Sequence, residues 1–321
     1  MKTLLFAAML AAGPSFAQSP TNWKLATGFR AESFHTQNIA QFAREAGAAS
    51  SGQLTIEVMP NGTLAKLADI SQAVRDGKAQ AGETIMTSMT RDIPIAGADS
   101  VPFVVSSYSD AQRLWKLQRP GIERHFAARG LKLLYAVPWP PQGLHSSKPI
   151  RSLPDFKGTQ MRTYNATTLR IAELLSAKPV DVPMVDVGKA LAEGRMDNMI
   201  TSALTGVENK VWGQIKYYYE INAWFPKNVV FVNSKAFEAL KPEVRSAVVK
   251  AAGDAETRGW ASSQALATSA TEELRANGVK IERIPPDVDA EIKRMGEKFS
   301  REWVRSVGNE ANTIFVPYYI K

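Results

Sequence analysis

The sequence contains no cysteine and only three histidines, His35, His125 and His145. Without cysteine the chain has neither a disulfide framework nor a thiol nucleophile, so its fold has to rest on a hydrophobic core. No two histidines stand at i, i+4 spacing around a glutamate, and the patterns G-x-S-x-G, P-loop and G-x-G-x-x-G are missing. These absences point away from an enzyme, and we expect neither a metal nor a cofactor.

Blocks of like charge are missing as well. The formal net charge is +8, but lysine and arginine are scattered among acidic residues, and no basic run is interleaved with aromatic residues. That distribution does not suit nucleic acid, and we expect no nucleic-acid partner. A modestly basic balance is compatible with an anionic small molecule.

The apolar run from Leu4 to Ala12 is too short to anchor a protein in a membrane. It follows Lys2 and precedes Ser15-Phe16-Ala17, the small-x-small pattern of a signal-peptidase site. We therefore expect residues 1–17 to be a cleaved signal peptide and the mature protein to be soluble in the periplasm. Because Lys2 is the only charged residue lost, the formal charge falls from +8 to +7.

Strand and helix patterns alternate along the remaining chain, which predicts an α/β protein. A mature length of about 300 residues favours two domains. Strands are expected near 23–29, 54–59, 81–88, 131–137, 160–163, 178–183, 196–201, 227–233 and 279–284. Helices are expected over 34–49, 64–76, 109–129 with a break at Pro120-Gly121, a segment capped by Asn165, one capped by Asp186, and 243–277 and 287–305.

Two crossings between the domains are expected. The proline-rich segment 138–141 is stiff and extended, which suits a first crossing, and the strand over 227–233 would return the chain. The helix over 243–277 would be about 50 Å long, enough to lie against both domains, with a kink near Gly253 and Gly259. This predicts domain I as 22–139 plus 228–262, and domain II as 140–227 plus 263–321, with a ligand cleft between them.

Arg162 ends one of these strands and precedes a helix. Ligands of open α/β sheets collect outside such strand ends, and a guanidinium matches a carboxylate bidentately. The same sequence pattern also fits a surface arginine that forms an ion pair with a neighbouring Asp or Glu. Glu83 and Ser88 are polar residues in an apolar segment, which either face the cleft or line an edge. Trp139 is either a cleft wall or ordinary interdomain packing.

Several motifs, taken together and in order, resemble one family. They are 52–60 (GQLTIEVMP), 74–77 (VRDG), 101–104 (VPFV), 153–162 (LPDFKGTQMR), 183–197 with its ALAEGRMD ending, 216–220 (KYYYE), 229–233 (VVFVN) and 240–245 (LKPEVR). The chain resembles the DctP-type substrate-binding proteins, the periplasmic receptors of tripartite ATP-independent periplasmic (TRAP) transporters. This resemblance implies that Arg162 binds the carboxylate of an organic acid.

Departures from the family pattern bear on the ligand. Gln142 stands where sialic-acid-binding members carry a second arginine, Thr201 replaces a common asparagine, and the Glu-Trp pair of metal-holding members is missing. The resemblance then implies an aromatic or apolar 2-oxo or 2-hydroxy monocarboxylate. Further contacts are expected from Glu83 and Ser88, and from apolar or aromatic residues at family contact positions, namely Phe34, Leu67, Trp139 and Trp212.

The expected partners are the small and large membrane subunits of a TRAP permease, served by a monomeric receptor. Three different functions stay open at this point: a sugar-acid receptor of the same family, specific for uronates or aldonates; a binding protein that serves a membrane sensor; and a periplasmic enzyme acting on organic acids.

Overall fold

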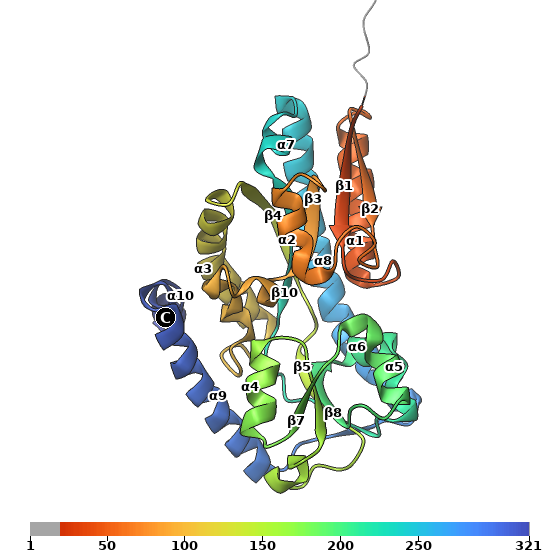
Figure 1. The fold of residues 1–321 in the computed structure, drawn as a ribbon, viewed down its shortest axis with the longest axis vertical. Helices are drawn as coiled ribbons and strands as arrows, with labels where there is room; N and C mark the ends of the chain where they lie inside the picture. The colour runs from red at the N-terminus through yellow and green to blue at the C-terminus, as the bar shows by residue number, and fades with distance from the viewer. Residues whose placement is uncertain (1–19, 321) are drawn as a thin grey trace, which may run out of the picture.

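The chain folds into two lobes, each built on its own β-sheet (Figure 1). The computed structural model describes residues 20–320, so the expected signal peptide, 1–17, lies outside the described residues. None of the helices within 20–320 is both long enough and apolar enough to cross a membrane. The α/β class and the two-lobed architecture are as the sequence predicts.

The first lobe contains a five-stranded sheet in the order β2-β1-β3-β10-β4. Its strands are β1 (Thr21–Thr27), β2 (Leu54–Met59), β3 (Ala81–Ile85), β4 (Leu131–Pro138) and β10 (Lys227–Asn233). Its helices are α1 (Phe34–Ala49), α2 (Ile70–Arg75), α3 (Tyr108–Ala127) and α7 (Ser234–Glu238). Only β10 runs antiparallel to its two neighbours, because it enters this sheet from the other lobe.

The second lobe contains a six-stranded sheet in the order β11-β9-β5-β8-β6-β7. Its strands are β5 (Gln142–Ser146), β6 (Gln160–Thr163), β7 (Lys178–Asp181), β8 (Asn198–Ser202), β9 (Tyr217–Tyr219) and β11 (Lys280–Glu282). Its helices are α4 (Ala166–Leu174), α5 (Val187–Ala192) and α6 (Ala203–Glu208). Here β5, which enters from the first lobe, is the strand that runs antiparallel to both neighbours.

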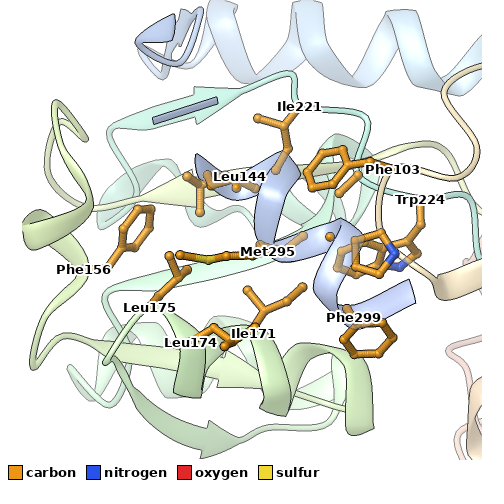
Figure 2. Close-up of a pocket in the computed structure, with 15 residues that line it drawn as sticks. Phe103, Leu144, Phe156, Ile171, Leu174, Leu175, Ile221, Trp224, Met295 and Phe299 are labelled. Atoms are coloured by element: carbon orange, nitrogen blue, oxygen red, sulfur yellow. The ribbon is translucent and has the colours of Figure 1, made fainter. Parts of the chain in front are cut away.

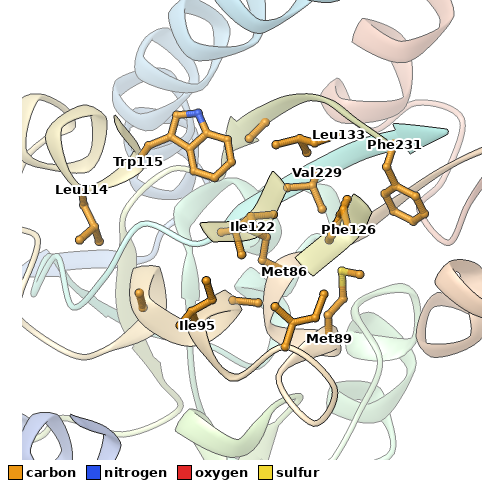
Figure 3. Packing of buried hydrophobic residues seen from close by; sticks show 14 of the residues in the cluster. Met86, Met89, Ile95, Leu114, Trp115, Ile122, Phe126, Leu133, Val229 and Phe231 are labelled. Atoms are coloured by element: carbon orange, nitrogen blue, oxygen red, sulfur yellow. The ribbon is translucent and has the colours of Figure 1, made fainter. Parts of the chain in front are cut away.

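One hydrophobic core of the first lobe lies between its sheet and the segment from β3 to α3. Figure 3 shows side chains of α3 and of two short helices, η2 (Met86–Met89) and η3 (Pro94–Ser100), meeting residues of β4 and β10. Phe126 of α3 and Phe231 of β10 pack edge to face with ring centroids 5.4 Å apart. Helix α3 continues through Pro120, so the break expected there is wrong. Gly121 explains the close packing, since a Cβ there would lie 2.5 Å from Ile95 of η3.

The two crossings lie side by side. The backbone N–H of Trp139 in the first crossing donates to the carbonyl of Pro226 in the second at 2.8 Å, and Gln142 donates to Trp224 at 3.0 Å. Lys227 is anchored in the first lobe, because its ammonium and its backbone N–H both reach Asp99 of η3, at 3.2 and 2.8 Å. The crossings therefore form a short hydrogen-bonded hinge.

Helix α8 (Pro242–Ala276) spans both lobes, as expected (Figure 1). It packs on α1 and β4 of the first lobe and on α6 and β11 of the second. The helix is unbroken, so no interruption occurs at Gly253 or Gly259. Gly259 instead allows close approach, because a Cβ there would lie 2.3 Å from the side chain of Val137.

The chain ends with α9 (Pro286–Val307) and α10 (Asn309–Tyr319). Helix α9 leaves the second lobe, and α10 packs against α3 of the first lobe, where Ile314 and Phe315 join the core. The domain boundaries stay a prediction. The packing of α10 favours assigning residues 309–319 to the first lobe rather than to domain II.

Candidate functional site

A cleft of about 640 Å³ lies between the lobes at the hinge. Arg162, Gln142, Thr201, Trp139 and Ser88, singled out from the sequence, meet in its lining, together with Leu67. The first lobe also contributes Gly28, Phe29, Asn61, Gly62, Lys66, Ala68 and Ile85, and the second lobe and hinge contribute Tyr164, Asp181, Pro183, Met184, Val185, Asp186, Thr205 and Pro226.

Arg162 is the buried cation of this cleft. It lies in β6, which pairs with β7 on one side and β8 on the other, and Arg162 is 3% exposed. Its Nε donates to the carbonyl of Val182 at 2.9 Å, and its guanidinium carbon lies 4.7 Å from the ring centroid of Tyr164. These contacts orient the guanidinium by one edge and one face.

The charge of Arg162 has no carboxylate partner nearby. Within residues 20–320, no Asp or Glu oxygen lies within 4.0 Å of its nitrogens. Burial lowers the pKa of Arg162 to about 10, against small opposing effects of Tyr164 and Asp181. The group is therefore still a cation at neutral pH, and an anion entering the cleft would meet a desolvated positive charge.

Tyr164 and Gln142 form a polar pair beside this cation. The Tyr164 hydroxyl donates to Oε1 of Gln142 at 3.2 Å, and Nε2 of Gln142 donates to the carbonyl of Pro140 at 2.9 Å. Burial raises the pKa of Tyr164 to about 12, so the hydroxyl keeps its proton. Sequence reasoning missed Tyr164. The signal was its position two residues after Arg162, since side chains at i and i+2 of an extended segment share a face.

An aromatic wall closes the first-lobe side. The ring of Trp139 lies 5.4 Å from that of Phe29, and its indole Nε1 donates to Oδ1 of Asn228 at 2.8 Å. Phe34 and His35 pack against Trp139, at 5.5 and 4.4 Å between ring centroids. Trp139 thus both lines the cleft and packs between the lobes.

Three residues expected to touch ligand lie outside the lining. Phe34 is partly buried and packs edge to face against Trp139, and Trp212 is a partly buried residue packed on the core of the second lobe. Glu83 is 1% exposed and accepts hydrogen bonds from Thr27 and Asn228. Direct contact of these three residues with the ligand stays a prediction, and their positions favour a role in supporting the residues that line the cleft.

Glu83 belongs to a buried polar network beneath the wall. Nδ2 of Asn228 donates to Glu83 at 2.7 Å, and Nδ1 of His35 lies 3.6 Å from the same carboxylate oxygen. Burial raises the pKa of Glu83 to about 7, although the bonds from Thr27 and Asn228 oppose the shift. The network joins the end of β1 and the start of α1 to the hinge residues Trp139 and Asn228.

The turn at Asn61-Gly62 also reaches the cleft, which sequence reasoning did not anticipate. Both residues have positive φ, 60° and 65°. Their backbone N–H groups donate to the carbonyls of Phe29 and Thr27 at 2.8 and 3.0 Å. The turn is therefore docked on the end of β1, and only this tertiary contact brings it to the cleft.

A second, apolar cavity lies under α9 and is separate from the cleft. Figure 2 shows Met295 and Phe299 of α9 facing Ile171 and Leu175 across it. It offers about 20 Å³, the room of about one water molecule, so it does not suit an organic acid.

Known proteins are similar to this chain in sequence and in fold. Residues 25–306 match the family model DctP, described as bacterial extracellular solute-binding protein, family 7. The crystal structure of DctP6 from Bordetella pertussis, an extracytoplasmic solute receptor binding pyroglutamic acid, is 34% identical with a TM-score of 0.91, covering 94% of this chain and 100% of that one. DctP7 from the same organism, also described as binding pyroglutamic acid, is 36% identical with a TM-score of 0.90, covering 93% and 99%.

A curated relative is more distant. The 2,3-diketo-L-gulonate-binding periplasmic protein YiaO of Escherichia coli is 22% identical over 268 residues, 79% of this chain and 80% of that protein. Members of the family are solute-binding receptors rather than enzymes. The chain belongs to the DctP family of bacterial extracellular solute-binding proteins, the receptors of TRAP transporters.

Proposed function

We propose that the protein is a periplasmic receptor that binds a compact monocarboxylate in the cleft and delivers it to the small and large membrane subunits of a TRAP permease. One observation carries the proposal. Arg162 is buried and charged, and no carboxylate within residues 20–320 forms an ion pair with it. The carboxylate of the ligand would complete the pair bidentately, because the Nη groups of Arg162 are the part of the fork not bonded to Val182.

The charges around the cleft favour a single carboxylate. Arg162 and Lys66 are balanced by Asp181 and Asp186 in the lining. A second carboxylate on the ligand would have to approach these acids, which disfavours dicarboxylates.

The body of the ligand would lie against the aromatic wall of Trp139 and Phe29. Pyroglutamate is the first ligand to test, because the two structures at 34% and 36% identity are described as binding it. It combines one carboxylate with a small ring and an amide, and the amide would form hydrogen bonds with hydroxyl groups of the lining such as that of Thr201. An apolar 2-oxo or 2-hydroxy monocarboxylate shares the same carboxylate and apolar body.

A sugar acid would need more polar partners. A uronate presents several hydroxyls, whereas the amide of Gln142 is already bonded to Tyr164 and Pro140. Leaving buried hydroxyls unpaired would cost affinity.

The experiment is a thermal-shift and calorimetric screen of the protein lacking residues 1–17. The panel contains pyroglutamate, aromatic and branched 2-oxo and 2-hydroxy acids, dicarboxylates and uronates. A ligand at one hundred times its dissociation constant stabilises the fold by about 2.7 kcal/mol. Binding of a monocarboxylate in preference to dicarboxylates supports the proposal. Binding only of uronates supports a sugar-acid receptor, and no binding by any acid contradicts the proposal.

Two further readouts distinguish a transport receptor from an enzyme and from a sensor-coupled binding protein. Chromatography of the released ligand tests for an enzyme, because a receptor returns the ligand unchanged. Uptake of labelled ligand into vesicles carrying the permease subunits tests for transport, and ligand-dependent activation of a membrane kinase in the absence of uptake would indicate a sensor-coupled protein. Sedimentation tests the expected monomer.

A further inference from the structure

Arg30 bridges the two lobes at the rim of the cleft. It lies in the first lobe, shortly after β1 ends at Thr27 and directly after Phe29, which lines the cleft. Its guanidinium donates three hydrogen bonds to the second lobe. The acceptors are the carbonyl of Glu208 at 3.2 Å, the carbonyl of Val185 at 2.5 Å and Oδ1 of Asn209 at 3.1 Å.

These three acceptors, called here the Arg30 socket, all belong to the second lobe, and contacts within that lobe hold Asn209 in place. Nδ2 of Asn209 donates to the carbonyl of Thr205 at 2.9 Å, and the backbone N–H of Gly188 donates to Oδ1 of Asn209 at 3.3 Å. These contacts orient the Asn209 oxygen without help from Arg30. This acceptor is therefore oriented in advance, which lowers the cost of forming its hydrogen bond with Arg30.

The socket is continuous with the cleft lining. Val185 belongs to both, and Thr205, which holds Asn209, also lines the cleft. Arg30 reaches these acceptors only when the lobes lie together. Hydrogen bonds formed in one arrangement of two lobes and not in the other stabilise the first arrangement by their free energy.

The contacts of Arg30 with the second lobe differ from an ordinary surface ion pair. Within residues 20–320 no carboxylate lies within 4.0 Å of its nitrogens, and two of its acceptors are backbone carbonyls near the cleft. Bonds to charged donors are stronger than bonds between neutral groups, and partial burial of Arg30 limits screening by water.

We propose that Arg30 is a positioning residue, a latch that holds the cleft closed and slows the release of ligand. The inference rests on the proposed function, since it takes the cleft to be the ligand site. The latch acts on the closed state, so it changes the dissociation rate far more than the association rate.

The test measures both rates for pyroglutamate by stopped-flow tryptophan fluorescence. In Arg30→Ala we expect the dissociation rate to rise about tenfold or more while the association rate stays within about threefold. Arg30→Lys keeps the charge but not the planar fork, so its dissociation rate should fall between the two. The matched control is Arg195→Ala, because Arg195 is exposed and pairs with Glu193 inside the second lobe.

A second readout follows closure directly. Because the chain has no cysteine, Arg44→Cys on α1 and Lys189→Cys on α5 allow one spin label on each lobe at exposed positions. At saturating pyroglutamate we expect a longer or broader distance distribution in Arg30→Ala than in the parent. A merely structural role for Arg30 would lower the melting temperature without changing this distance.

The outcomes separate the latch from the proposed function. Failure of the parent protein to bind any acid of the panel contradicts both. Binding by the parent, with unchanged dissociation rate and distance in Arg30→Ala, overturns the latch alone. If Arg30→Ala does not fold, Arg30→Lys carries the same comparison.

Discussion

Replacing Arg162 with methionine should separate ligand affinity from stability. Methionine keeps much of the side-chain volume and can still pack beside Tyr164, but it removes the charge and the donor to Val182. The bidentate contact with a carboxylate is worth about 1.5–3 kcal/mol, so the dissociation constant should rise about 10- to 150-fold.

The stability of the ligand-free protein should respond differently. Burial lowers the pKa of Arg162 from its ordinary value to about 10, which corresponds to about 3 kcal/mol of unfavourable desolvation for the charged form. Removing the charge relieves this cost and offsets the lost hydrogen bond, worth about 1 kcal/mol, and the lost contact with the Tyr164 ring, worth about 1–2 kcal/mol. We therefore expect the free energy of unfolding to fall by no more than about 1 kcal/mol.

The assays are calorimetric titration with pyroglutamate and urea unfolding without ligand, on the protein lacking residues 1–17. Arg151→Met serves as the control, since Arg151 is an exposed residue of the same lobe. Affinity within about threefold of the parent would show that Arg162 does not hold the carboxylate, because a bidentate contact is worth more than that. A fall in unfolding free energy well beyond about 1 kcal/mol would show that Arg162 is chiefly structural.

Three further substitutions test the environment of the site. The folded pKa of Glu83, about 7, lies above its ordinary 4.5, so its contribution to stability is present below pH 4.5 and is lost as pH rises through 7. Between about pH 5 and 8 the free energy of unfolding of the parent, measured with urea, should therefore fall by up to about 3 kcal/mol more than that of Glu83→Gln. Parallel pH profiles of the two proteins would contradict this. Lys227→Met leaves Asp99 buried and unpaired, so it should lower the free energy of unfolding by about 3–5 kcal/mol in the same assay, and a loss below about 1 kcal/mol would refute the role of the pair. Gly259→Ala places a Cβ 2.3 Å from a side chain of β4 and should lower the free energy of unfolding by about 1–3 kcal/mol. Gly253→Ala has nothing within 4 Å of the new Cβ and should be neutral or stabilising. Equal effects of the two substitutions in thermal melts would exclude close packing as the reason for Gly259.

The local sequence determined much of the secondary structure. The predicted bounds 34–49, 54–59, 160–163 and 227–233 agree with α1, β2, β6 and β10. Asn165 caps α4 as predicted, accepting from the N–H of Thr168 at 2.9 Å. These elements follow from side-chain periodicity and capping, which depend on residues within a few positions of one another.

The sequence also placed Arg162 at a strand end, and the fold brings four other predicted contact residues, with Leu67, into the same cleft. What the periodicity did not show was how strands from different parts of the chain pair. The strand β5 and the helix α10 were not predicted, because β5 is short and polar and α10 contains Pro317.

Tertiary structure alone decided the remaining chemistry. Arg30 and its acceptors are separated by more than 150 positions in the chain, and no periodicity connects them. Glu83 reads as a cleft residue in the sequence, but strand pairing places Asn228 beside it and Thr27 on the neighbouring strand, which takes its carboxylate out of the lining. The sequence by itself determined most of the strands and helices and placed Arg162 at the end of a strand. Packing of distant segments decided which polar groups are already partnered and which remain available to a ligand, because burial and hydrogen bonding depend on neighbours in space rather than along the chain.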